Sequence, residues 1–93
     1  MSDEDPARRV PVFKRGIKLR FDAVRDAWIV LGPERLFLPD EQAVEVLKLV
    51  DGARSLGDIT EDLCGRFNAP RDVVMADVVV MLDDLAGKGV MTW

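Results

Sequence analysis

Few side chains in this sequence could carry out acid–base or nucleophilic chemistry. Its 93 residues contain no histidine, no tyrosine and one cysteine, Cys64. That composition excludes a histidine-based triad, a histidine-ligated metal and an internal disulfide. The adjacent carboxylates Asp83-Asp84 and Glu61-Asp62 lie in helix-forming segments, where neighbours point about 100° apart, which favours solvation over a shared catalytic site. We therefore expect no enzymatic activity, no cofactor and no metal.

The chemistry that remains is recognition of another chain, and residues 70–88 carry its clearest signal. At helical spacing this segment presents two adjacent apolar stripes. The first is Val74, Val78, Met81 and Leu85, and the second is Met75, Val79, Leu82 and Ala86. Together they span roughly 160°, which is wider than the ~100° stripe of a one-sided surface helix. Either a large core surrounds this helix, or part of it receives a partner.

The elements that must position this helix come before it in the chain. Residues 17–22, 28–31 and 36–38 are short, apolar or alternating segments typical of strands. Because strands that are neighbours in sequence usually pair, they predict an antiparallel meander. Strands followed by helices indicate an α+β fold. We predict a winged helix-turn-helix-like architecture, in which an N-terminal three-stranded antiparallel sheet is followed by a three-helix bundle.

Capping residues define the three helices. Asp40 is placed to cap the first, which Asp51-Gly52 is expected to close. The second follows the capping box Ser55-Leu56-Gly57-Asp58. Its expected buried residues are Leu56, Ile59, Leu63 and Phe67. The third begins at Pro70 and ends at Gly87 or Gly89, before a short extended tail.

Residues 1–14 are expected to be a flexible arm, and residues 15–93 a single domain. The arm contains Pro6 and Pro11 and no periodic pattern. It also lacks the basic start and apolar stretch of a signal peptide. The longest apolar run in the chain, residues 78–82, is far too short to span a membrane. With one cysteine, these features predict a cytoplasmic protein.

The third strand, Leu36-Phe37-Leu38, is predicted to lie at an edge of the meander. It carries no inward-pointing charge, and an unprotected edge can accept a strand from another chain. The surplus apolar surface of the third helix could line a pocket for the side chains of that strand. Arg35 and Arg71 could pair with carboxylates of the bound peptide, and Asp77 and Asp84 with its cations.

The same residues admit two other interpretations. The apolar side chains could simply be core, or the edge could join two copies of the chain in a homodimeric structural module. A winged-helix DNA-binding regulator is the third alternative. It is disfavoured because residues 70–88 carry four aspartates against Arg71 and Lys88, so phosphates would be repelled. We therefore expect no nucleic-acid partner.

Four stretches together resemble the PqqD family of pyrroloquinoline quinone biosynthesis proteins. They are Gly16–Asp22, Leu31–Arg35, Ala43–Gly52, and Ala76-Asp77-Val78 with Met81, Leu82 and Leu85 downstream. The similarity covers about residues 15–91, and a broader likeness extends to the peptide-recognition elements of many peptide-modifying pathways. The chain departs from the family pattern at Leu38-Pro39, before the first helix.

The resemblance implies a non-catalytic peptide chaperone. Such a protein binds the ribosomally made precursor peptide PqqA and presents it to PqqE, a radical S-adenosylmethionine enzyme that links a glutamate to a tyrosine in that peptide. The peptide is expected to add to the third strand, beside the third helix. The expected peptide-binding residues are Arg35, Leu36, Phe37, Leu38, Arg71, Val74, Met75, Val78, Val79 and Leu82.

Overall fold

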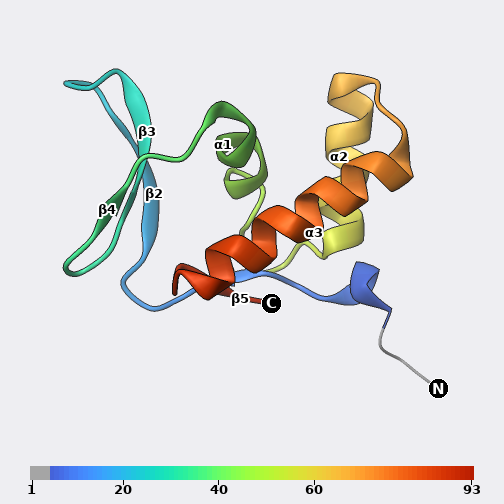
Figure 1. Cartoon of the computed structure of the whole chain (residues 1–93), viewed down its shortest axis with the longest axis horizontal. Coiled ribbons are helices and arrows are strands. Elements are labelled where there is room, and N and C mark those ends of the chain that lie inside the picture. The colour runs from blue at the N-terminus through green and yellow to red at the C-terminus, as the bar shows by residue number, and fades with distance from the viewer. Residues whose placement is uncertain (1–4) are drawn as a thin grey trace.

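A three-stranded antiparallel sheet precedes three helices in the computed structural model, which describes residues 5–93 (Figure 1). Strands β2 (Lys18–Asp22), β3 (Ala27–Leu31) and β4 (Leu36–Phe37) lie in the order β2-β3-β4. The meander and the α+β class are therefore confirmed. Strand β4 is one residue shorter than expected, because Leu38 follows it without pairing.

The strand register places one row of apolar side chains on a single face of the sheet. Leu19 is paired with Val30, Phe21 with Trp28, and Val30 with Phe37. Paired residues on adjacent strands project to the same side. Val30 belongs to the buried core, and both Leu19 and Phe37 pack against it. This face is therefore the one that the sheet turns toward the helices.

Helix α1 (Glu41–Leu47) begins where the sequence predicted and ends earlier. The Asp40 carboxylate caps it by accepting a hydrogen bond from the N–H of Ala43 at 2.8 Å. Beyond Leu47 the backbone tightens into three-residue turns, which bring Leu49 and Val50 into the core. The expected end at Asp51-Gly52 was wrong: α1 ends at Leu47, and the residues that follow form tighter turns.

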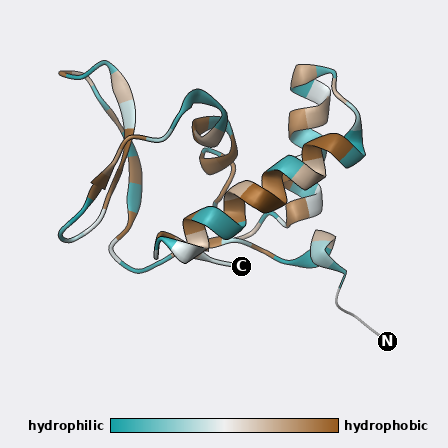
Figure 2. Cartoon of the chain, in the orientation of Figure 1, coloured by the Kyte–Doolittle hydropathy of each residue, from teal (hydrophilic) through white to brown (hydrophobic). Residues whose placement is uncertain are grey.

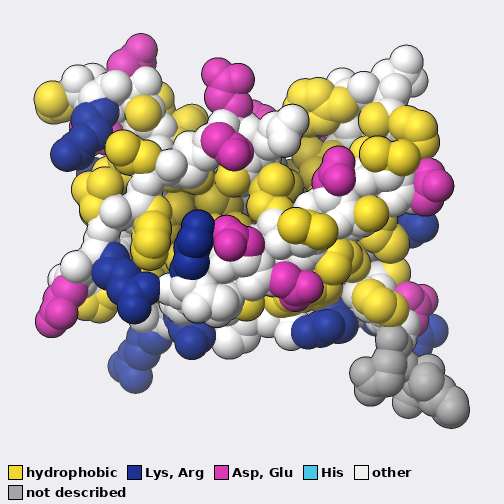
Figure 3. Space-filling model, viewed as in Figure 1, with side chains coloured by type: hydrophobic (Ala, Val, Ile, Leu, Met, Phe, Trp, Pro, Cys, Tyr) yellow, Lys and Arg dark blue, Asp and Glu magenta, His cyan; other side chains and the backbone are white. Residues whose placement is uncertain are grey.

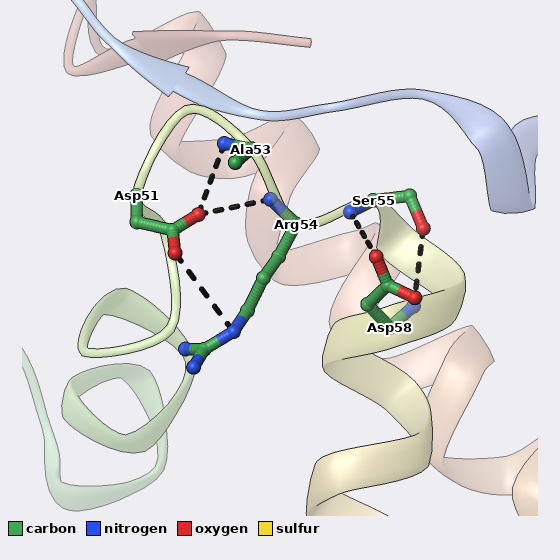
Figure 4. A network of polar contacts seen from close by, with 5 residues as sticks. All are labelled: Asp51, Ala53, Arg54, Ser55 and Asp58. Atoms are coloured by element: carbon green, nitrogen blue, oxygen red, sulfur yellow. Dashed lines mark hydrogen bonds and ion pairs between the residues drawn. The ribbon is translucent and has the colours of Figure 1, made fainter.

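Helix α2 (Leu56–Phe67) starts at the predicted capping box, drawn in Figure 4. The Ser55 hydroxyl accepts from the N–H of Asp58 at 3.1 Å, and the Asp58 carboxylate accepts from the N–H of Ser55 at 3.0 Å. Just before it, the Asp51 carboxylate accepts from the backbone N–H groups of Arg54 and Ala53, which lowers the pKa of Asp51. The loop and the start of α2 are thus fixed by local hydrogen bonds.

Replacing Ser55 with alanine should lower the free energy of unfolding by about 1 kcal/mol, because α2 loses its N-cap acceptor. Urea denaturation measures this difference. Ser55→Thr keeps the hydroxyl and serves as the control. An equal loss in both variants would show that the hydroxyl is not responsible.

Helix α2 ends at Asn68, whose φ of 52° is left-handed, and α3 (Arg71–Gly87) follows. The sequence pattern was wrong about one expected core residue of α2. Phe67 was predicted to be buried, but 57% of it is exposed. It occupies the last turn of α2, beyond the part of that helix that the core covers, whereas Leu56, Ile59 and Leu63 are buried as predicted.

Residues 5–13 differ from the loose arm that the sequence suggested. They contain the 3₁₀ helix η1 (Pro6–Arg8) and strand β1 (Val12–Phe13), which pairs antiparallel with β5 (Met91–Thr92) at the C-terminal end. Figure 1 shows this segment passing below α3 toward α2. The Arg9 guanidinium lies 4.0 Å from the centroid of the Trp93 ring and donates to the Trp93 carbonyl oxygen. Residues 1–4 of the predicted arm lie outside the described part.

The core lies where α1, α2 and α3 meet the sheet and β5. Its fully buried apolar side chains are Pro11, Val30, Leu47, Leu56, Ile59, Leu82, Val90 and Met91. In Figure 2, hydrophobic residues occupy much of α3. Every helix within residues 5–93 is too short or too polar to cross a lipid bilayer.

Candidate functional site

A groove of about 850 Å³ lies between the sheet and α3, with residues of α1 and α2 completing its walls. Figure 3 shows hydrophobic side chains gathered in a hollow between these elements. A groove of this volume falls in the size range of ligand sites. Its mostly apolar lining and its position beside an exposed sheet edge make it the main candidate for binding another chain.

The sheet wall of the groove is aromatic. Phe21 and Trp28 are cross-strand partners whose rings meet edge-on, with centroids 5.6 Å apart. Phe21 is 46% exposed, and Leu38, which also lines the groove, is 63% exposed. Large apolar side chains that are this exposed mark a surface whose burial by a partner is favourable.

Strand β4 provides an open backbone edge. In the described part of the chain β4 pairs with β3 alone, as β2 does at the other edge of the sheet. The N–H of Gly32 donates to the carbonyl of Arg35 at 2.9 Å. Because hydrogen-bonded and non-hydrogen-bonded pairs alternate along an antiparallel ladder, the N–H and C=O of Leu36 point away from β3. The Arg35 guanidinium donates to the Lys88 carbonyl at 2.5 Å, which ties the start of β4 to the end of α3.

The two apolar stripes of α3 have different surroundings. Val74, Val78 and Met81 of the first stripe line the groove, together with Asp77. In the second stripe Leu82 is fully buried, while Met75 and Val79 are half-buried against the core. Val78 and Leu85 of the first stripe are themselves buried in the core. The apolar surface of α3 is therefore wide because the helix both closes the core and borders the groove.

The structure separates the ten residues that the sequence nominated for peptide binding. Leu38, Val74 and Val78 line the groove. Arg35 and Phe37 line a separate hollow of about 280 Å³. Leu36 is 43% exposed on the sheet face opposite to the core.

The remaining nominated residues lie on α3 outside the groove lining. Met75, Val79 and Leu82 contribute to the core side of the helix. Arg71 pairs with Glu61 through a 2.5 Å contact between its Nε and a carboxylate oxygen. Contact of any of the ten with a peptide stays a prediction.

Sequence reasoning missed several groove-lining residues. Phe21, Trp28, Phe67 and Met81 line the groove but were not nominated. Met81 belonged to the first helical stripe, so its spacing was a usable signal. Phe21 and Trp28 could have been found by aligning the two strands across their turn. Phe67 was included in the apolar face of α2, but the pattern assigned it to the core and not to the groove.

The charged residues of the groove are mainly acidic. Asp26, Glu41, Glu45 and Asp77 line it, against a single cation, Lys48. Lys48 lies 3.5 Å from the Glu45 carboxylate and 4.9 Å from the centroid of the Trp28 ring. Within residues 5–93, no group of three or more Cys, Asp or Glu residues is arranged to hold a metal ion. The groove therefore combines an apolar lining with negative charge.

Comparisons with known proteins agree on one family. The family model for coenzyme PQQ synthesis protein D (PqqD) matches residues 27–91. A protein of Bradyrhizobium diazoefficiens named PqqA binding protein is 49% identical over 82 residues, which make up 88% of this chain and 80% of that relative. The matched region includes β3, β4 and all three helices.

Two solved structures share the fold. One is the solution NMR structure of the PqqD truncation of Methylobacterium extorquens PqqCD, described as a functional and stand-alone recognition element for ribosomally synthesized and post-translationally modified peptides. It is 40% identical with a TM-score of 0.76, and the match covers 95% of this chain and 98% of that one. The other is the crystal structure of PqqD from Xanthomonas campestris, 31% identical with a TM-score of 0.56 over 95% and 93% of the two chains.

Proposed function

This chain belongs to the PqqD family, and on that premise we propose that it is a peptide adaptor of pyrroloquinoline quinone biosynthesis. It binds the precursor peptide PqqA in the groove and presents it to the radical S-adenosylmethionine enzyme PqqE. The name of the Bradyrhizobium relative supports the choice of peptide. The observation that carries the proposal is an apolar groove of about 850 Å³ whose lining includes Leu38, the residue that directly follows the open strand β4.

The proposed binding mode is addition of the peptide as a strand along β4. The outward N–H and C=O of Leu36 would pair with the peptide backbone, which gives affinity without sequence preference. Side chains on one face of the added strand would enter the groove and contact Leu38, Val74 and Val78. The Arg35 contact to the end of α3 would hold β4 in position beside that helix.

The adaptor contributes proximity rather than chemistry. The chain has no histidine or tyrosine, and in this proposal the reacting side chains belong to the peptide and the catalytic groups to the partner enzyme. Holding a flexible peptide near the site of that enzyme raises its effective concentration. Because the peptide is ordered as it binds, its affinity should be moderate for the area it covers.

Titration of ¹⁵N-labelled protein with synthetic PqqA tests the proposal. We expect amide shifts at Leu36 and Leu38 and along residues 74–81. Shifts confined to η1 and β1 would contradict the groove. An unpaired edge can also join two copies, so sedimentation velocity at the same concentrations accompanies the titration. A dimer that the peptide does not dissociate would favour self-association at β4 instead.

The strand mode has a sharper test in the peptide itself. N-methylation of every second backbone amide removes the hydrogen bonds to β4. In this mode one peptide N–H donates to the Leu36 carbonyl, and with that bond contributing about 1 kcal/mol its loss should weaken binding roughly fivefold. The matched control carries the methyl groups on the alternate amides, which point to solvent. Equal effects of the two series would contradict strand addition.

A further inference from the structure

The groove offers a peptide much more negative charge than positive charge. Its lining contains four carboxylates and one ammonium group. Glu45 is already paired, at 2.6 Å from the Arg66 guanidinium and 3.5 Å from Lys48. Asp26, Glu41 and Asp77 form no ion pair with any residue from 5 to 93. Three carboxylates on three different elements are therefore available to a bound chain.

The two arginines that the sequence suggested as partners for peptide carboxylates are engaged elsewhere. Arg71 is 2.5 Å from the Glu61 carboxylate, and Arg35 donates to the Lys88 carbonyl at 2.5 Å. Neither lines the groove, and Lys48 is held by Glu45 and the Trp28 ring. A peptide carboxylate in the groove would meet no free cation among the lining residues.

Asp77 has the most direct position of the three available carboxylates. It lies on the α3 wall next to Val78, three residues after Val74 and four before Met81, so Val74 and Met81 are its neighbours along the helix surface. Asp26 lies in the β2–β3 turn, and Glu41 in the first turn of α1. Asp84, one further aspartate of α3, lies outside the groove lining and pairs with Lys88 at 3.0 Å.

We propose that the groove selects a peptide segment in which a lysine or arginine is flanked by apolar residues, and that Asp77 is the specificity-determining carboxylate that receives the cation. This inference rests on the proposed function and adds the chemistry of the peptide. The apolar neighbours of the cation cover the α3 wall, while its long side chain reaches the carboxylate with the aliphatic stem against apolar surface. Asp26 and Glu41 add to the field that attracts the cation during association.

Charge reversal at Asp77 tests the inference. We expect Asp77→Lys to weaken binding of synthetic PqqA at least tenfold in 50 mM NaCl, measured by calorimetry. The loss should shrink at 300 mM NaCl, because salt screens the pair. Asp84→Lys changes the net charge equally on the same helix and should alter affinity less than twofold. Circular dichroism of both variants checks that the fold is intact.

A charge swap identifies the peptide side chain. Each lysine or arginine of the peptide is replaced in turn by glutamine and then by glutamate. One glutamine replacement should weaken binding to the wild-type protein, and the glutamate at the same position should bind Asp77→Lys better than wild-type. Equal losses in Asp77→Lys and Asp84→Lys would overturn the inference, as would a peptide series with unchanged affinity, although the proposed function would stand. Failure of PqqA to bind the wild-type protein at any salt concentration would overturn both.

Discussion

Replacing Leu82 with alanine should lower the free energy of unfolding by about 3 kcal/mol, within the range measured for buried leucines. Leu82 is fully buried in α3 and belongs to the core that also contains Leu56 and Ile59. The substitution removes buried apolar surface and leaves a cavity that the neighbouring helices fill only in part. For a domain of this size we expect a fall in Tm of roughly 15 °C.

Val80→Ala is the matched control for this measurement. Val80 lies two residues away on the same helix but is 69% exposed, so its loss should change the free energy of unfolding by less than about 0.5 kcal/mol. Thermal and urea denaturation of the two variants make the comparison. Similar stability in both would mean that Leu82 is not a core residue. Leu82 would then belong to the partner-binding surface that the sequence pattern also allowed.

Replacing Met81 with glutamine should weaken PqqA binding at least tenfold while leaving most of the stability. Met81 is half-buried and lines the groove. Glutamine has nearly the same length and no charge, so the change replaces apolar lining with an amide. When a peptide covers that amide, it loses its hydrogen bonds to water without a replacement from the apolar lining, which costs about 1–3 kcal/mol. A loss of 1.4 kcal/mol corresponds to tenfold in affinity.

The neighbouring residue again supplies the control. Val80→Gln introduces the same amide into α3 on a side that does not line the groove. Its affinity for PqqA should match that of the wild-type protein within twofold. Calorimetry gives the affinities, and thermal unfolding of the free variants separates lost binding from lost folding. Unchanged binding by Met81→Gln would place the peptide elsewhere on the molecule.

These two predictions concern adjacent positions of α3 with different roles. Leu82 stabilises the fold, and Met81 faces the groove. A helix that is apolar around much of its circumference can therefore serve both purposes. This arrangement accounts for the apolar surface of α3, which is wider than one side of a core needs in a 93-residue chain.

The sequence by itself determined the local elements. Alternation predicted β2, and short apolar segments predicted β3 and β4. Hydrogen-bonding side chains marked helix starts at Asp40 and at Ser55-Asp58, where the structure places them. These signals are reliable because each depends on interactions between residues a few positions apart. The composition was equally informative, since a chain without histidine lacks the commonest catalytic base.

Only the tertiary structure decided which apolar surfaces face one another. The pairing of β1 with β5 joins residues about 80 positions apart, and two-residue strands leave no periodic signal. The early end of α1 and the exposure of Phe67 depend on how far the core extends. The division of α3 into a core side and a groove side, and the gathering of Asp26, Glu41 and Asp77 around one hollow, depend on how the helices pack on the sheet. Helical periodicity orders residues around an axis, but it does not specify which neighbour each side of that axis meets.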